Sequence, residues 1–402
     1  MRIGMILDNE FTGDLRVENE VIALQKENHE VFVLALNYGD KKRQENFSGA
    51  TIFRISIYLF VKKKLRGLNN TIFDLYPAFW VKRIKKFIWQ NKIDVLHVHD
   101  LWMLDSAYKA NKDFNLPVIA DLHENFVDAL SHYKYTNTFL GKILISVKRW
   151  RQSEIEWTNK ADNIITVIEE AVERYQTLGI KEGKISVVAN YVNYENFLAY
   201  PIDDLLVKRF SNKFIATYIG GFDSHRGLES VIKSMPQIVR EIKNFHLILV
   251  GKGSNYEDLV NLANTLQVSS YISFEGWQLT NILSSYIKAS SLCLIPHLKT
   301  AHTDNTIPHK LFQYMILEKP VVASNCDPIK RIIDETQAGV IYESNNEVDL
   351  AQKIIHLYKN PELQLEMGRR GKKAVMEKYN WYETSRELIS LYSNLESKKE
   401  NG

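Results

Sequence analysis

The chain has 402 residues, 45% of them apolar, with a formal net charge of +3 and two cysteines, Cys293 and Cys326. This length predicts about two domains, because single hydrophobic cores stop growing near about 250–300 residues. The cysteines have neither disulfide nor metal-site spacing, which excludes a secreted disulfide scaffold and favours a reducing, cytoplasmic compartment. The opening MRIGMILD predicts a β-strand and not a signal peptide, and no apolar run approaches the ~18 residues of a membrane span.

Apolar strands alternate with helices through the first half of the chain, which predicts an α/β domain with a parallel, doubly wound sheet over residues 1–195. Strands are predicted at residues 2–7, 30–36, 51–56, 95–98, 118–121, 163–167 and 185–188. Helices are predicted at residues 15–27, 73–90, 102–114, 140–160 and 169–178.

The loop after the first strand carries two candidate site residues. Gly13 allows the backbone to approach a bound ligand closely. Arg16 opens the following helix and is a candidate ligand contact, since its guanidinium can pair with an anion. The alternative for Arg16 is an ion pair with Glu20, one helical turn further on.

Basic residues are concentrated between Lys41 and Lys92, where 13 Lys or Arg face only two acids, Glu45 and Asp74. Within this segment, Lys82, Arg83, Lys85 and Lys86 form what we call the basic face of the predicted helix, and its apolar residues share another face. Such a helix suits an anionic membrane surface, which predicts a peripheral protein at the inner face of a membrane. The alternative is a sheet-covering helix with its lysines in water. Nucleic acid is not expected, because no basic-aromatic recognition motif recurs.

Two strand ends of the first half carry histidines. His97 and His99 alternate on one strand and share a sheet face, but no third ligand has suitable spacing, so no metal is predicted. His99 with Asp100 is expected to form a strand-end pair or an acceptor contact. His123, with Glu124 beside it, follows the next strand and is the candidate to hydrogen-bond a ligand hydroxyl or stabilise developing charge. The alternative is a histidine that orders the loop.

A linker is predicted near residues 190–212, after which the alternation of strands and helices resumes and predicts a second α/β domain over residues 196–380. In this half, the strand KFIATYI ends in Gly220-Gly221, and Arg226 precedes the next helix. Paired glycines admit a ligand to the backbone, and an Arg at a helix start can hold phosphate with its fork of donors. A similar junction follows the strand HLILV at Gly251.

The segment TDNTIPHKLFQYMILEKPVVAS, residues 303–324, predicts a loop, a helix and a buried strand. Thr306 is the expected helix cap, Pro308 is expected in the first turn, and Ile307 lies near the free N–H groups of this turn. Lys310 adds a cation one turn in, so the helix start is a predicted anion site.

Three strand–glycine–helix junctions in one half of the chain, two of them with cations, indicate a nucleoside diphosphate across the carboxyl edge of the sheet. Trp277, just after Gly276 at a strand end, is a candidate neighbour of the nucleobase. The alternative for Trp277 is a core or rim position.

The order YIGG, HRGL, LILVGKG, FEGW, SLCLIPH and IPHKLFQYM…KPVVAS resembles family 4 glycosyltransferases over nearly the whole chain. The resemblance implies the GT-B fold, in which two Rossmann-like domains flank a cleft and a C-terminal helix, here residues 381–402, crosses back to the first domain. It also implies retaining, metal-independent transfer from a nucleotide sugar, linked to UDP or GDP, with no separate cofactor. A histidine at the position of His123 points at the donor sugar in that family. With this resemblance, Gly13 is expected near the donor phosphates or the acceptor, and Arg16 and His99 are acceptor-side candidates.

The chain departs from the family pattern at four positions. Gly221 occupies the place of the family's Arg, and Arg226 occupies the place of its Lys. The two Glu of the family signature map onto Asn305 and Gln313, and both amides can still hydrogen-bond hydroxyl groups of the donor. Gln313 is the expected ribose contact.

The resemblance implies front-face transfer, with the leaving diphosphate stabilised by Arg226 and Lys310 and no dedicated base. Asp304 is the alternative, as a carboxylate nucleophile. The predicted acceptor is a glycan or polyprenol-linked precursor of a surface polysaccharide. Two rival functions stay open: an inactive, donor-binding partner subunit, motivated by the two amides, and a nucleotide-sugar epimerase.

Overall fold

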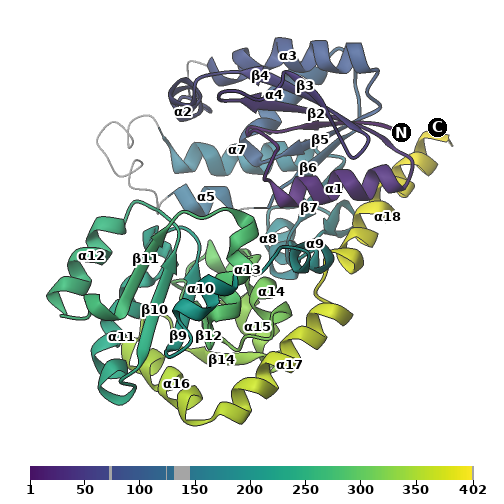
Figure 1. Cartoon of the computed structure of the whole chain (residues 1–402). Helices are drawn as coiled ribbons and strands as arrows, with labels where there is room; N and C mark the ends of the chain where they lie inside the picture. The colour runs from purple at the N-terminus through teal and green to yellow at the C-terminus, as the bar shows by residue number, and fades with distance from the viewer. Residues whose placement is uncertain (72–74, 124, 131–144, 401–402) are drawn as a thin grey trace. The chain divides into compact units, whose positions relative to one another are not determined.

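The computed structural model of the protein describes residues 1–71, 75–123, 125–130 and 145–400. The chain forms two compact units. Unit 1 comprises Met1–Asn190 and Thr384–Gly402, and unit 2 comprises Tyr191–Glu383. Each unit is built on its own sheet (Figure 1), so the predicted class, two parallel-sheet α/β domains, is confirmed.

The sheet of unit 1 has the strand order β3-β4-β2-β1-β5-β6-β7-β8. Every pair is parallel except β3 with β4, which is antiparallel. The central strands are almost wholly buried, as expected where helices cover a parallel sheet. The strands are β1 (Arg2–Ile6), β2 (Glu30–Asn37), β3 (Gln44–Phe47), β4 (Ala50–Ser56), β5 (Val95–His99), β6 (Val118–Asp121), β7 (Asn163–Thr166) and β8 (Ile185–Val187).

The described helices of unit 1 follow its strands, and α3 packs beside α4. They are α1 (Leu15–Lys26), α2 (Leu59–Gly67), α3 (Leu75–Asn91), α4 (Leu101–Asn111), α5 (Phe126–Ala129), α7 (Val147–Lys160), α8 (Glu169–Thr177) and α18 (Trp381–Glu400). The predicted starts of two helices, at residues 73 and 140, lie outside the described residues. The sequence pattern does not indicate β3 and α2, since β3 has four residues and α2 buries none.

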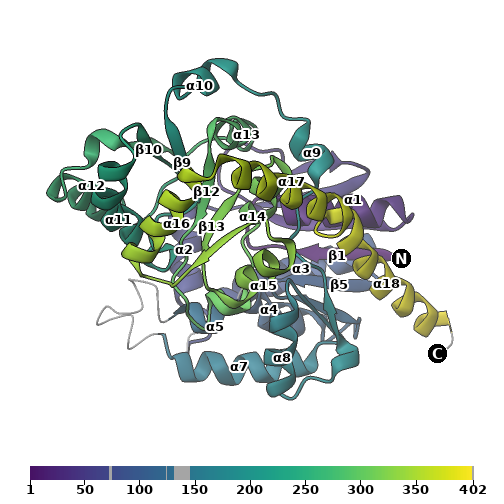
Figure 2. The same cartoon turned by 90° about the horizontal axis from the view of Figure 1, so that it is seen from below.

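The last helix, α18, belongs to unit 1 from Thr384 onward. Its Tyr392 hydroxyl lies 2.9 Å from Nδ1 of His97 in β5, and the Met1 ammonium lies 3.0 Å from the Glu396 carboxylate. Figure 2 shows α18 beside the start of β1. The chain therefore returns to its first unit at its end.

The sheet of unit 2 is parallel throughout, in the order β11-β10-β9-β12-β13-β14. Its strands are β9 (Phe214–Ile219), β10 (Phe245–Val250), β11 (Ile272–Gly276), β12 (Leu292–Ile295), β13 (Val321–Ser324) and β14 (Gly339–Tyr342). Its helices are α9 (Tyr194–Leu198), α10 (Asp204–Arg209), α11 (Leu228–Glu241), α12 (Tyr256–Thr265), α13 (Thr280–Ala289), α14 (Lys310–Ile316), α15 (Asp327–Thr336), α16 (Glu347–Lys359) and α17 (Pro361–Glu377).

The predicted linker begins at the boundary between the units, and it contains two short helices, α9 and α10, each started by a capping side chain, Asn193 and Asp203. One local prediction for this unit is wrong. Helix α14 starts at Lys310 and is not capped by Thr306. The Thr306 hydroxyl donates instead to the carbonyl of His302, at 3.2 Å, which holds residues 302–306 in a turn before the helix.

Candidate functional site

Three glycine junctions of unit 2 lie at the carboxyl ends of the neighbouring strands β11, β10 and β9. The Gly220 amide donates to the Val250 carbonyl at 2.9 Å, and the Gly251 amide donates to the Gly276 carbonyl at 2.7 Å. Gly220 and Gly251 have φ of +148° and +145°, and a Cβ on Gly251 would collide with the Gly220 carbonyl oxygen. Only glycine fits this close approach of backbones. The predicted glycine residues therefore lie together at one sheet edge.

Three basic side chains gather at the same edge. Nη1 of Arg226 lies 3.2 Å from Nε2 of His297, which follows β12. The Lys310 ammonium lies 4.0 Å from the ring centre of Tyr218 and next to the position that a Cβ on Gly220 would occupy. Within the described part of the chain, Nζ of Lys310 and Nε of Arg226 are buried and have no hydrogen-bond partner. We call Arg226, His297 and Lys310 the cation cluster.

Among the described residues, no carboxylate forms an ion pair with the cation cluster. Burial lowers the pKa of Lys310 well below its usual range, and the Arg226 guanidinium lowers it further. Burial also lowers the pKa of His297, with further contributions from Arg226 and Lys310. A bound anion would reverse these shifts, because it stabilises each protonated form.

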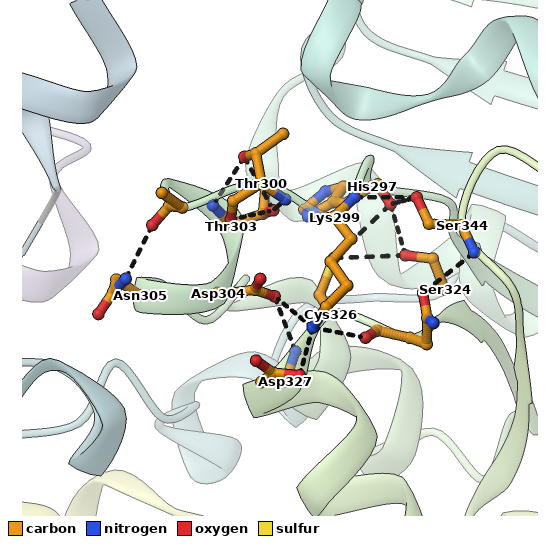
Figure 3. Close-up of polar contacts among 12 residues, drawn as sticks. His297, Lys299, Thr300, Thr303, Asp304, Asn305, Ser324, Cys326, Asp327 and Ser344 are labelled. Carbon is orange, nitrogen blue, oxygen red and sulfur yellow. Dashed lines mark hydrogen bonds and ion pairs between the residues drawn. The ribbon is translucent and has the colours of Figure 1, made fainter.

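The loop after β12 is held by its own polar side chains (Figure 3). The Thr303 hydroxyl donates to the Leu298 carbonyl at 2.6 Å. The Asp304 carboxylate lies 3.2 Å from the Lys299 ammonium and accepts from the amide of Asp327 at 2.9 Å. Asp304, the alternative nucleophile, is thus engaged in holding the loop on α15.

The two amides that replace the family's acids lie in different settings. Nδ2 of Asn305 donates to the Ala301 carbonyl at 2.8 Å, and Figure 3 shows the side chain directed away from the Lys299 contacts. Gln313 is 6% exposed on α14, and its side-chain amide makes no hydrogen bond to the described residues. Ile307 is buried, whereas Trp277 is 62% exposed beyond the end of β11. Gln313 therefore keeps free donors and acceptors, and Trp277 occupies a rim position.

In unit 1, His123 and Asp100 come together at the ends of β6 and β5. Nε2 of His123 lies 3.3 Å from Oδ1 of Asp100. Asp100 has φ of +74°, which is uncommon for a residue with a side chain, and its amide donates to the Asp121 carbonyl at 2.9 Å. The predicted pairing of His99 with Asp100 is wrong, since successive residues of a strand point to opposite faces. His99 instead lies 3.1 Å from Asp121.

Arg16 is enclosed by partners of its own unit. Nη2 of Arg16 lies 3.1 Å from Glu20 and 2.9 Å from Asp121, and Nη1 donates to the Val188 carbonyl at 2.8 Å. The predicted ion pair with Glu20 is confirmed. Gly13 has φ of +91°, and a Cβ there would meet no atom within 4 Å, but its amide already donates to the Glu18 carboxylate at 2.7 Å.

No third ligand has suitable spacing in the sequence, but the structure brings two further potential ligand groups to the histidines. Glu20 and Asp121 converge on His97 and His99, and one ligand atom from each lies within 4.8 Å of the others. Sequence spacing could not reveal this, because Glu20 comes from α1 and Asp121 from the adjacent strand β6.

The apolar residues of α3 lie in the core, whereas the basic face is at the surface. Trp80, Ile84, Phe87 and Ile88 are at most 4% exposed. The apolar stripe therefore packs on the sheet, as the alternative interpretation predicted, and membrane contact by the basic face stays a prediction. In the described part of the chain, no helix combines the length and the apolar character that crossing a bilayer requires.

Two family models match the chain, namely Glycosyltransferase Family 4 over residues 16–196 and Glycosyl transferases group 1 over residues 207–374. An uncharacterised glycosyltransferase of Haemophilus influenzae is 27% identical over 315 residues, which cover 77% of this chain and 80% of the relative. A phosphatidyl-myo-inositol mannosyltransferase of Mycolicibacterium smegmatis is 21% identical over 410 residues, with coverage of 98% and 94%.

Among solved structures, the Anabaena protein HepE in complex with UDP-glucose has a TM-score of 0.72 and 13% identity, over 98% of this chain and all of that chain. The two parallel-sheet units and these matches define a glycosyltransferase of the GT-B fold. The chain belongs to glycosyltransferase family 4, and the matched segments together span most of its length.

Proposed function

We propose that the protein is a retaining glycosyltransferase that transfers a hexosyl group from a nucleoside-diphosphate sugar to a lipid-linked or surface-polysaccharide precursor. The cation cluster is the observation that supports a nucleoside-diphosphate sugar as the substrate. Its buried N–H groups, Nε of Arg226 and Nζ of Lys310, have no hydrogen-bond partner among the described residues. Charge-assisted hydrogen bonds from such groups to phosphate oxygens are strong and directional. The UDP-glucose complex of HepE supports UDP as the first donor nucleotide to test.

The proposed chemistry uses charge stabilisation at the diphosphate. The bond between C1 of the sugar and the β-phosphate oxygen breaks, and the acceptor oxygen bonds to C1 on the same face. The departing phosphate oxygen takes the acceptor proton, while Arg226 and Lys310 stabilise the developing negative charge. No metal ion is required in this proposal, because the two basic side chains supply the charge. His123, oriented by Asp100, is the candidate sugar contact.

Binding and turnover with a panel of UDP-, GDP- and ADP-sugars test this proposal. Arg226→Ala should weaken nucleoside-diphosphate affinity by about tenfold or more, as expected for loss of a charged hydrogen bond. Arg209→Ala is the matched control, since Arg209 lies in the same unit and pairs with Glu275 at 2.8 Å. If the two variants bind nucleoside diphosphate with equal affinity in calorimetry, Arg226 does not hold the donor diphosphate. The anomeric configuration of the product, read by NMR, decides between retention and inversion.

The inactive-partner function is the second candidate, and Asn305 and Gln313 motivate it. Slow release of free sugar from one nucleotide sugar in the absence of acceptor supports an active transferase. Tight nucleotide binding without release or transfer would instead support a partner subunit. Interconversion of two nucleotide sugars would support the epimerase.

The acceptor side of the proposal includes an anionic membrane surface. The basic face of α3 supports it, and so do Tyr58 and Phe60 beside α2, which are 73% and 61% exposed. Each basic residue near an anionic surface contributes about 1 kcal/mol. Changing the basic face to Gln should release the protein from acidic liposomes at low salt. The matched control changes Arg369, Arg370, Lys372 and Lys373 of α17, and equal loss in both variants would mean that only net charge matters.

A further inference from the structure

Four potential metal-ligating side chains meet inside unit 1, and we call them the buried cluster: Glu20 of α1, His97 and His99 of β5, and Asp121 of β6. Each of them is at most 1% exposed. Three separate elements supply them, and β1, β5 and β6 are neighbours in the sheet. The proposed transfer reaction uses none of these four side chains.

Nδ1 of His99 lies 3.1 Å from Oδ2 of Asp121, whereas the contacts made by the two Nε2 atoms of the buried cluster are too long for hydrogen bonds. Nε2 of His97 lies 3.7 Å from both Oε2 of Glu20 and Oδ2 of Asp121, and Nε2 of His99 lies 3.8 Å from Oε2 of Glu20. Consequently, both Nε2 atoms and both Glu20 oxygens have no hydrogen-bond partner among the described residues. Buried polar atoms without hydrogen-bond partners are rare and destabilising, so we expect a bound ion, water or proton at the centre of the cluster.

The separations favour a cation over a water molecule. Ligands bonded to a tetrahedral cation at about 2.1 Å lie about 3.4 Å apart. Partners of one water, each at about 2.8 Å, lie about 4.6 Å apart. The separations of 3.7 and 3.8 Å around the two Nε2 atoms are nearer to the value for a cation, and the full set of four ligand atoms lies within 4.8 Å.

The polar atoms of the buried cluster that face away from its centre are hydrogen-bonded to neighbouring side chains, as is common for metal ligands. Nδ1 of His97 lies 2.9 Å from the Tyr392 hydroxyl, which fixes the ring with Nε2 turned inward. Arg16 lies 2.9 Å from Oδ1 of Asp121 and 3.1 Å from Oε1 of Glu20, and its Nε also donates to Oδ2 of Asp121 at 3.2 Å. These contacts orient both carboxylates and leave Oε2 of Glu20 facing the two imidazoles.

We propose that the buried cluster is a closed binding site for one divalent transition-metal ion of the Zn²⁺ class. Two imidazoles with two carboxylates suit Zn²⁺ or Co²⁺ better than Mg²⁺ or Ca²⁺. Because all four positions are filled by protein and buried, the site is structural and offers no place for substrate. It would join α1 to β5 and β6 directly beneath Asp100 and His123. The rival occupant is a single proton, since Arg16 balances only one of the two carboxylates.

The test uses the full-length, tag-free protein, stripped with a chelator and then titrated with ZnCl₂ or CoCl₂. Elemental analysis should give one Zn²⁺ per chain. The Tm should rise by about 5 °C when free Zn²⁺ reaches about a hundred times its Kd. X-ray absorption should report mixed nitrogen and oxygen ligands, and Co²⁺ should give the intense visible bands of four-coordinate geometry.

His99→Gln should lose the bound metal and the rise in Tm. His246→Gln in unit 2, which also replaces a buried histidine, should keep both. If His99→Gln does not fold, the Co²⁺ spectrum of the unmodified protein still decides the question. Absence of stoichiometric metal, an unchanged Tm with Zn²⁺, or metal retained in folded His99→Gln would each overturn the proposal. The first two results would assign the cluster to the shared proton.

Discussion

Replacing Lys310 with Met should move nucleotide affinity and folding stability in opposite directions. The Lys310 ammonium lies at the glycine edge of unit 2, buried and without a hydrogen-bond partner among the described residues. If it exists to hold an anion, the folded protein without ligand bears the cost of its desolvation. Met keeps most of the side-chain volume and removes the charge.

The expected magnitudes follow from these surroundings. A charged hydrogen bond to phosphate is worth about 1.5–3 kcal/mol, so diphosphate affinity should fall by about 10- to 150-fold. Relief of an unpartnered buried donor returns roughly 1–3 kcal/mol of stability, and loss of the cation–π contact with Tyr218 removes about 0.5–2 kcal/mol. The net change in the free energy of unfolding therefore lies between about −1 and about +2.5 kcal/mol, and the middle of both ranges gives a rise of about 0.8 kcal/mol.

Lys319 provides a matched control in the same unit. Its ammonium donates to the carbonyl oxygens of Lys288, at 2.9 Å, and Ser290, at 2.5 Å. Burial lowers the pKa of Lys319 as well, so the two lysines differ mainly in whether protein acceptors satisfy them. Lys319→Met should lower the free energy of unfolding by about 1–2 kcal/mol and leave diphosphate affinity unchanged.

Calorimetric titration with UDP and GDP, together with urea unfolding of both variants, measures the two quantities. The reasoning is refuted if Lys310→Met behaves like Lys319→Met, with lower stability and unchanged affinity. Equal loss of affinity in both variants would mean that the unit is generally perturbed. Loss of affinity in Lys310→Met alone, without loss of stability, is the expected result.

Three further outcomes are expected. Because the pKa of Lys310 is lowered, diphosphate binding should take up protons above that pKa and weaken as pH rises, which calorimetry in buffers of different ionisation enthalpy measures. Between that pKa and the ordinary lysine pKa, the folded state holds fewer protons than the unfolded state, so the Lys310 contribution to stability rises with pH. Gly227→Ala should lower the Tm by several degrees and weaken donor binding, since its Cβ would strike the Pro296 carbonyl. Asp100→Asn should lower kcat more than it changes KM and shift the pH–rate profile if it orients His123; an unchanged profile contradicts that role.

The sheet edge of unit 2 that carries the glycines and the cation cluster can be predicted from the sequence, because each of its motifs lies within one short segment. A strand that ends in Gly220-Gly221, with Arg226 a few residues on, specifies turn chemistry and charge within one continuous segment. Lys310 was found in the same way, although its helix starts later than the capping pattern predicted. His297 was overlooked because it follows an ordinary buried strand, and only the pairing of β12 with β9 brings it beside Arg226.

The buried cluster of unit 1 could not be predicted from neighbouring residues of the sequence, because its side chains come from distant segments. The alternation of His97 and His99 predicts that they share one face of β5, but the carboxylates that face them lie far away in the sequence, on α1 and β6. Which strand lies beside β5 is decided by sheet topology, and no residue near the histidines encodes it. The same limit explains the wrong partner of His99, since the sequence neighbour Asp100 points to the other face and the spatial neighbour Asp121 does not.

The amide at Gln313 is best understood together with the glycine at position 221. The family pattern has two basic residues at the first glycine turn and an acid at the helix position, whereas this chain has one basic residue and an amide. Gln313 lies three residues after Lys310 on α14, within reach of an ion pair. An acid there would compete with the diphosphate for Lys310 and leave Arg226 alone to oppose the added repulsion.

Gln313→Glu should therefore weaken diphosphate affinity by about tenfold, and Gln313→Ala should raise the donor KM more than it lowers kcat. Faster transfer by Gln313→Glu would show that the amide is a lost function, and it would strengthen the inactive-partner candidate.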